Sequence, residues 1–150
     1  MVTLPRTLVF LGLTLLLSGC AALQNPLRSN RTDGGIRNEG GATIISGRAL
    51  DEQRGTLLDT MEGRVPGMNV LRHVDQCPQV SLRSHVTFHS VVNPYVYVDG
   101  TRAIDTCILD MLTTDNVESI EIYPTGVTKR PGYSTHAHGL ILVFSRGATL

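Results

Sequence analysis

Three apolar runs in the second half of the chain give the clearest pattern of hydrophobic and polar positions. They are residues 94–100 (PYVYVDG), 117–123 (VESIEIY) and 139–144 (GLILVF). Each run is rich in β-branched, aromatic and aliphatic residues and is bounded by Pro, Gly or Asp, which is typical of a β-strand. In 117–123 the apolar residues alternate with Ser119 and Glu121, which predicts one buried and one solvated face. Residues 140–144 are apolar without alternation, which predicts a strand covered on both faces.

Two further segments show helical periodicity, one between the first two runs and one upstream of all three. Residues 104–112 carry apolar side chains at i, i+3, i+4, i+7 and i+8, namely Ile104, Cys107, Ile108, Met111 and Leu112. Upstream, Thr56 and Asp59 have the spacing of a capping box, with Leu57, Leu58, Met61 and Val65 on one helical face. We expect Pro66–Gly67 to end this second helix.

Shorter elements complete the predicted order. Residues 43–46 and 68–71 are expected to be extended, 48–54 to hold a turn of helix, and 79–88 to alternate as a half-buried strand. Asp99–Gly100 is expected to be a strand-ending turn. The pattern therefore predicts an α+β fold, with a small mixed β-sheet and two packed helices.

The N-terminus has the organisation of a bacterial lipoprotein signal peptide. Arg6 precedes an apolar run, residues 8–17, that is too short to span a bilayer. Leu17-Ser18-Gly19-Cys20 follows and resembles a lipobox, in which Cys20 receives palmitate-type acyl chains and becomes the new N-terminus. Residues 1–19 are therefore predicted to be the signal peptide. Ala21 rather than Asp after the cysteine favours the outer membrane over the inner membrane.

The segment after Cys20 is polar and rich in glycine, so residues 20–41 are predicted to be a lipidated N-terminus with a flexible linker. The folded domain is expected at 42–147, with a short tail at 148–150. Thirteen basic and thirteen acidic residues balance, which gives no electrostatic case for nucleic acid as a partner. The sequence leaves the oligomeric state open.

Four motifs occur in an order that resembles a known family. They are GRVPGMNV at 63–70, VYVDG at 96–100, NVESIEI at 116–122 and GLILV at 139–143. Together they resemble the plug domain of TonB-dependent outer-membrane receptors. The resemblance implies a plug-like α/β domain that docks to a partner or binds a small ligand through its loops.

The chain departs from that family in ways that matter for function. A receptor continues into a large barrel, whereas this sequence ends at Leu150, so we expect a stand-alone lipoprotein without the barrel. The Arg-Gly that usually ends the central strand is Arg83-Ser84 here, and the usual YG-type loop reads YSTHAHG at 133–139. Transport through a barrel is therefore not carried over from the resemblance.

Cys77 and Cys107 remain after lipidation of Cys20. An oxidising periplasm favours a disulfide between them. The alternative is that Cys107 is a buried core residue on the apolar stripe of its helix.

The candidate partner- or ligand-binding residues lie in the 124–138 loop and near 83–90. They are Arg83, His85, His89, Lys129, Arg130, Tyr133, His136 and His138. The four histidines suggest a metal site only if the fold brings the two pairs together, and scattered polar histidines are the simpler reading, so no metal or cofactor is predicted. No catalytic triad, activated cysteine or phosphate loop is present in the sequence.

These observations favour a non-catalytic interaction or accessory domain on an outer-membrane lipoprotein, associated with an outer-membrane receptor or transport complex. The membrane is reached through the lipid anchor, with the domain in the periplasm. The alternative is a periplasmic lipoprotein that binds a small ligand or a metal, and a third reading is a receptor remnant without a retained role.

Overall fold

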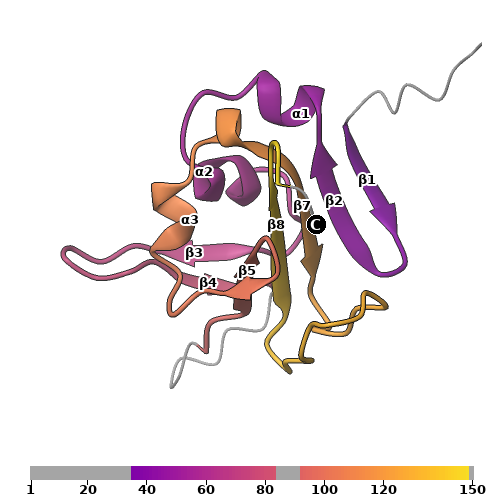
Figure 1. Cartoon of the computed structure of the whole chain (residues 1–150). Coiled ribbons are helices and arrows are strands. Elements are labelled where there is room, and N and C mark those ends of the chain that lie inside the picture. Colours follow the sequence, from indigo (N-terminus) through magenta and orange to yellow (C-terminus); the bar gives the residue numbers. More distant parts are fainter. Residues whose placement is uncertain (1–34, 84–91, 149–150) are drawn as a thin grey trace, which may run out of the picture. The chain divides into compact units, whose positions relative to one another are not determined.

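The computed structural model describes residues 35–83 and 92–148, and every structural statement below concerns these residues (Figure 1). Six strands form one mixed sheet in the order β1-β2-β7-β8-β5-β6. Their bounds are β1 Ile36–Glu39, β2 Ala42–Ser46, β5 Tyr95–Val98, β6 Thr101–Arg102, β7 Val117–Tyr123 and β8 Leu140–Ser145. The β5–β8 pair is parallel and the other pairs are antiparallel. A separate antiparallel ladder joins β3 (Asn69–Leu71) to β4 (Gln79–Ser81).

The helices are short: α1 (Arg48–Asp51), α2 (Leu57–Glu62), α3 (Ile108–Met111) and the 3-10 turn η1 (Thr114–Asn116). Figure 1 shows α2 and α3 on the same side of β7 and β8. The prediction of an α+β fold with a small mixed sheet and helices packed on it is confirmed. The predicted turn of helix at 48–54 is α1.

The alternation of the central strands sends side chains into two separate clusters. One face, which we call the helix-covered face, packs Ile45, Val96, Ile120, Ile122, Ile141 and Val143 against Leu50, Leu57, Leu58, Met61 and Leu109. The other, which we call the loop-covered face, gathers Ala42, Ile44, Tyr97, Tyr123, Leu140 and Leu142, with Tyr95, Tyr133 and Phe144 at its margin. Strand β8 contributes to both clusters, so the prediction that it is covered on both faces is confirmed.

The predicted wet face of β7 is wrong at Glu121. Its side chain belongs to the loop-covered face and the residue is only 5% exposed. Alternation in sequence assigns side chains to opposite faces but says nothing of what covers the second face.

Two hairpins close through two-residue turns with positive φ at both positions. Gly40 (58°) and Gly41 (82°) join β1 to β2, and Asp99 (47°) and Gly100 (82°) join β5 to β6. These angles suit the type I′ turn that matches the twist of paired strands. The turn predicted at Asp99–Gly100 is confirmed.

The sheet begins at Ile36, within the segment 20–41 that was expected to be a linker. All four residues of β1 are exposed, and its register with β2 runs from Ile36↔Ile45 to Glu39↔Ala42. Backbone pairing through the Gly40–Gly41 turn orders a segment that has too few apolar residues to be recognised as folded.

The helix predicted at 104–112 is reduced to Ile108–Met111. Ile104 is fully exposed and Met111 is 74% exposed, whereas Thr106 is buried and donates a hydrogen bond to the carbonyl of Pro78. The Asp105 carboxylate accepts a bond from the Cys107 amide, and this local turn replaces the first helical turn.

The capping of α2 agrees with the sequence, but its end does not. The Asp59 amide donates to Thr56 Oγ1 (3.2 Å), and that hydroxyl donates to the Asp59 carboxylate (2.8 Å). The helix ends at Glu62, before Pro66–Gly67, and the amides of Arg64 and Val65 both donate to the Met61 carbonyl. The strand predicted at 79–88 ends at Ser81, and residues 84–88 lie outside the described residues.

Candidate functional site

The connection from β7 to β8, residues 124–139 (the 124–139 loop), is held against the loop-covered face by three side-chain contacts. Arg130 pairs with Glu121, Tyr133 packs edge-on against Tyr97 with ring centroids 5.0 Å apart, and His136 stacks on Tyr95. Arg130, Tyr133 and His136 were all predicted as binding residues from sequence. In the structure their side chains anchor the loop.

Glu121 is the centre of the first contact. Arg130 donates from Nε to Oε2 (2.7 Å) and from Nη2 to Oε1 (2.5 Å), and the Tyr123 hydroxyl donates to Oε2 (2.8 Å). Burial of the carboxyl raises its pKa, but the hydrogen bonds from Arg130 and Tyr123 outweigh this and leave the pKa of Glu121 below its usual value. The carboxylate is therefore ionised, and its bonds with Arg130 hold the loop against the sheet.

The second contact is a three-layer stack around Tyr95. The His136 ring lies 3.7 Å from the Tyr95 ring centroid at an interplanar angle of 19°, and the Arg102 guanidinium lies 3.5 Å from the same centroid. Burial lowers the pKa of His136, and the nearby His138 and Arg102 add to that effect. A neutral imidazole is the form that suits a stack beside a guanidinium.

Backbone contacts close the loop on itself at Gly126. Its amide donates to the Tyr123 carbonyl (2.9 Å), and its carbonyl accepts from the His136 amide (3.1 Å). Gly126 has φ +70°, and a Cβ there would lie 1.6 Å from the His136 carbonyl oxygen. Only glycine fits this position without moving the loop.

The remaining predicted residues fall into three groups. Arg83 lies beside the loop and donates from Nε to the Pro124 carbonyl (2.9 Å). Lys129 and His138 are exposed, and the His138 ring lies 5.4 Å from that of His136. His85, His89 and Cys20 lie outside the described residues, so the proposed meeting of two histidine pairs stays a prediction.

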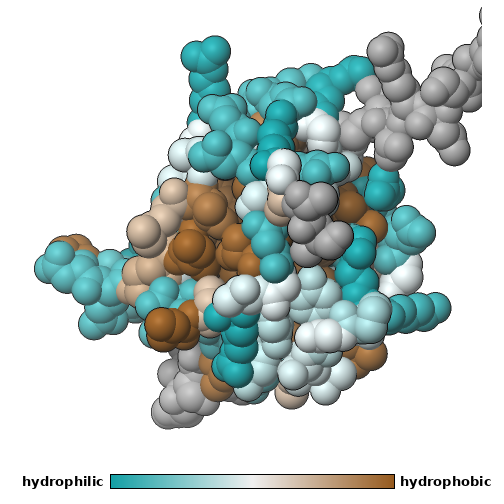
Figure 2. Space-filling model, viewed as in Figure 1, coloured by the Kyte–Doolittle hydropathy of each residue, from teal (hydrophilic) through white to brown (hydrophobic). Residues whose placement is uncertain are grey.

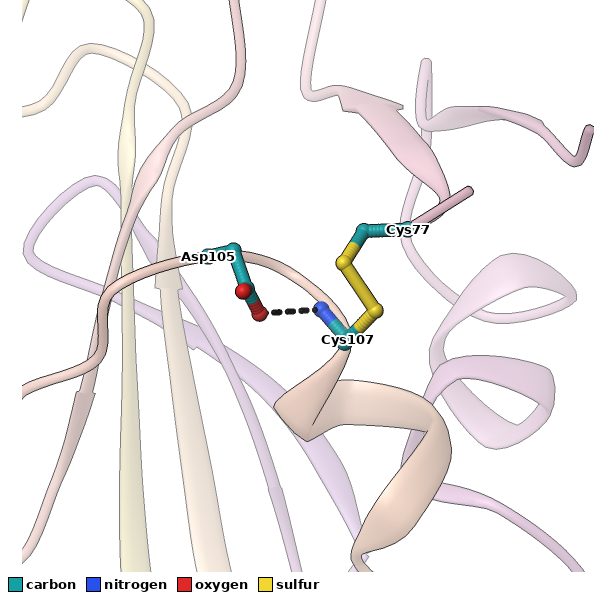
Figure 3. Close-up of side chains that lie close together, drawn as sticks. All are labelled: Cys77, Asp105 and Cys107. Atoms are coloured by element: carbon teal, nitrogen blue, oxygen red, sulfur yellow. Dashed lines mark hydrogen bonds between the residues drawn. A yellow bond between two sulfur atoms is a disulfide. The ribbon is translucent and has the colours of Figure 1, made fainter. Parts of the chain in front are cut away.

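Cys77 and Cys107 form a disulfide across 30 residues, from the segment before β4 to the start of α3. Figure 3 shows Asp105 beside it, bonded to the Cys107 amide. Among the described residues these three make the one cluster with ligand-type atoms close enough for a metal. Because both sulfurs are spent in the disulfide, the cluster is a structural cross-link.

Sequence reasoning missed the exposed apolar surface around α3. Ile104 and Met111 are 101% and 74% exposed, respectively, and Figure 2 shows apolar side chains gathered over α2 and α3. Both were assigned to the core because they share the apolar stripe of a longer predicted helix. The Asp105 carboxylate, which turns the chain before Ile108, was the available signal.

Open hollows lie along the β1–β2–β7 side of the sheet. One of about 430 Å³ is lined by Ser46, Asp51, Glu118 and Arg146 among others, and one of about 310 Å³ by Ile44, Tyr123, Lys129 and Arg130 among others. Both are lined by cationic and anionic side chains, and the second also by Ile44 and Tyr123. In the part of the chain that the structure describes, no helix is long and apolar enough to cross a membrane.

Comparison with known proteins gives a likeness of fold. No family model matches the chain. No curated protein matches it either. Among solved structures, a chain of the RagAB peptide importer in its "closed-closed" state matches with a TM-score of 0.55 and 17% identity, over 74% of this chain and 13% of that one. The "open-open" state of the same importer matches with a TM-score of 0.51 and 17% identity, over 71% and 12%. This chain therefore spans about an eighth of the length of the importer chains and shares the fold of that part.

Proposed function

We propose that this chain is an outer-membrane lipoprotein whose plug-like domain is a non-catalytic interaction module, acting with an outer-membrane receptor or transport complex. Acylated Cys20 would hold it to the membrane, with the domain on the periplasmic side. Two or more acyl chains give stable anchoring where a single chain is marginal.

The observation that carries the proposal is the shared fold. Most of the described domain superposes on one portion of a much longer importer chain. The four sequence motifs that resemble receptor plugs lie within the same domain. The order of the motifs and the likeness of fold to part of an importer chain both support the proposal.

The arrangement of side chains supports an interaction role over catalysis. The ionisable groups that cluster on the loop-covered face, Glu121 and Arg130, are spent on each other, and His136 is stacked on Tyr95. The surface around α3 instead exposes large apolar side chains, notably Ile104 and Met111. Exposed apolar patches of this kind mark contact sites, and methionine is enriched at protein interfaces.

The lipid part of the proposal is tested by labelling cells with a palmitate analogue. We expect label on the wild-type chain and none on a Cys20→Ala variant. An Asp115→Asn variant keeps Cys20 and the disulfide, and it should remain labelled. Label that persists in Cys20→Ala would remove the anchor from the account.

The interaction part is tested by affinity capture of the full chain from detergent-solubilised outer membranes. We expect a receptor or transport protein of the outer membrane in the captured material. Met111→Asp should reduce its recovery about tenfold, since a charge at an interface core is strongly unfavourable. Asp115→Asn, on the exposed turn that follows α3, is the control and should recover as much as wild type. Recovery that is equal for Met111→Asp and wild type would reject the α3 surface as the contact.

A further inference from the structure

Strand β1 forms one edge of the six-stranded sheet, and its outward side carries backbone groups ready to pair. The Ser46 amide donates to the Gly35 carbonyl (3.2 Å), so Gly35, Arg37 and Glu39 face β2 in the alternating antiparallel pattern. The N–H and C=O groups of Ile36 and Asn38 therefore point away from the sheet. All four residues of β1 are exposed.

Soluble proteins usually block such an edge with proline, a bulge, charged side chains or a very short strand. The β1 sequence Ile-Arg-Asn-Glu has no proline, and its register with β2 is continuous. Its two charges have opposite signs and lie on the same face, where Arg37 Nε and Glu39 Oε2 are 3.6 Å apart. An exposed pair of this kind contributes little stability, so either side chain can exchange its partner at small cost.

The charge pattern selects one antiparallel register between two copies of β1. Only registers that pair outward-facing residues with each other can form hydrogen bonds. Centring the two-fold axis on Asn38 pairs Asn38 with Asn38 of the second copy and places Arg37 opposite Glu39 in both directions. Shifting the register so that Ile36 meets Asn38 would place Arg37 opposite Arg37, and the opposite shift would place Glu39 opposite Glu39. Like charges directly opposite one another destabilise a strand pair, and opposite charges stabilise it.

We propose that β1 is a homodimerisation edge, at which a second copy of this chain adds its own β1 antiparallel, with Asn38 on the two-fold axis. The two sheets then continue into one another across the dimer. A ladder this short buries less than the roughly 1,200 Å² typical of stable complexes, so the dimer forms reversibly and depends on concentration. This inference does not depend on the function proposed above.

An engineered disulfide tests the geometry. Paired residues of the hydrogen-bonded type have Cα atoms about 5.5 Å apart, within the range that a disulfide spans. In the full chain, Asn38→Cys should give a disulfide-linked dimer under mild oxidation. Asp115→Cys, on an exposed turn far along the chain from β1, is the control and should give little. Equal cross-linking at the two positions would overturn the proposal.

The charges test the register. Added to the Asn38→Cys chain, Arg37→Glu or Glu39→Arg makes both cross-strand pairs repulsive and should lower the linked fraction by about tenfold. When the Arg37→Glu and Glu39→Arg chains carry different tags and are expressed together, both cross-strand pairs become attractive again. Mixed dimers should then recover to the level of the Asn38→Cys parent.

Recovery in the mixture also shows that neither charge variant is misfolded. If the single variants cross-link as well as the parent, the Asn38-centred register is wrong. If the mixed dimers do not recover while both variants remain resistant to protease, the edge pairing itself is wrong.

Discussion

The two faces of the sheet are covered by different kinds of side chain. The helix-covered face is closed by aliphatic side chains from α1, α2 and α3, and its central residues Ile120, Ile141 and Leu58 are fully buried. The loop-covered face is closed by aromatic rings, one ion pair and a glycine-dependent turn within the 124–139 loop. The first face is held by many equivalent contacts, whereas the cover of the second depends on a few specific ones.

The two faces should therefore differ in how much free energy their opening requires. Aliphatic packing is non-directional, and disrupting it lowers the stability of the whole domain. A loop anchored by Glu121–Arg130 and by the His136–Tyr95 stack can be released while the sheet stays folded, because local openings need less free energy than global unfolding. A module that meets a partner can use such a segment without risking its core.

The largest expected effect is on the helix-covered face. Ile120→Ala should lower the free energy of unfolding by about 2–5 kcal/mol, because it leaves a cavity in a close-packed core. Ile104→Ala removes an exposed side chain and should change stability by no more than about 0.5 kcal/mol. Urea unfolding of both variants measures the contrast, and similar losses would contradict the assignment of the core.

The disulfide ranks next. Replacing both Cys77 and Cys107 by serine should lower the free energy of unfolding by about 3–4 kcal/mol on the chain-entropy model, given the 30-residue separation. The same urea experiment measures it, with reduced wild-type protein as the comparison. A thiol assay on denatured, unreduced protein that finds both cysteines free would contradict the structure.

Much of the helix-covered face could be predicted from sequence, since its strands show the expected periodicity and the Thr56–Asp59 cap is local. The loop-covered face could not. Glu121 occupies a position that alternation assigns to a solvated face, and no pattern in the sequence predicts its ion pair with Arg130. Contacts of this kind depend on the path of an irregular loop, which periodicity does not encode.

The α3 region is a second case in which periodicity predicted the wrong burial. Five apolar residues at helical spacing predicted a buried stripe, but Asp105 and the disulfide set the chain's direction there and leave Ile104 and Met111 outside. A tertiary cross-link overrode a local pattern. The sequence also did not indicate that Arg130 and His136, which were predicted to bind a partner or ligand, hold the 124–139 loop against the sheet.

A glycine substitution should break the loop's cover without breaking the sheet. Gly126→Ala places a methyl group against the His136 carbonyl at a residue with φ +70°, which should cost about 1–3 kcal/mol. Amide exchange should quicken within 124–139 and stay slow in β7 and β8. Gly132→Ala is the control. Gly132 also has a left-handed φ (+89°), but a Cβ there would meet nothing within 4 Å. Uniform acceleration across the sheet would contradict the separation of the two faces.

The smallest effect is the pH dependence of Glu121. Its pKa is below the unfolded value of about 4.3, so the stability it contributes is fully present above that value and is lost as the pH falls through the folded pKa. We expect less than about 1 kcal/mol, because Arg130 is half-exposed and solvent screens the pair.

Urea midpoints of wild type and Glu121→Gln, compared between roughly pH 6 and pH 3, isolate this contribution. The difference between the two proteins should shrink on acidification. A difference that is constant across that range would show that the carboxylate is not the group responsible.

Site-specific photo-crosslinking in living cells tests whether the surface around α3 contacts an outer-membrane partner. A photoreactive amino acid at Met111, on the exposed apolar surface around α3, should yield a defined adduct with a receptor or transport protein of the outer membrane. The same group at Glu52, an exposed residue at the end of α1, is the control and should not. That contrast is what a plug-like interaction module predicts. Adducts that are absent at Met111, or equal at the two positions, would contradict it.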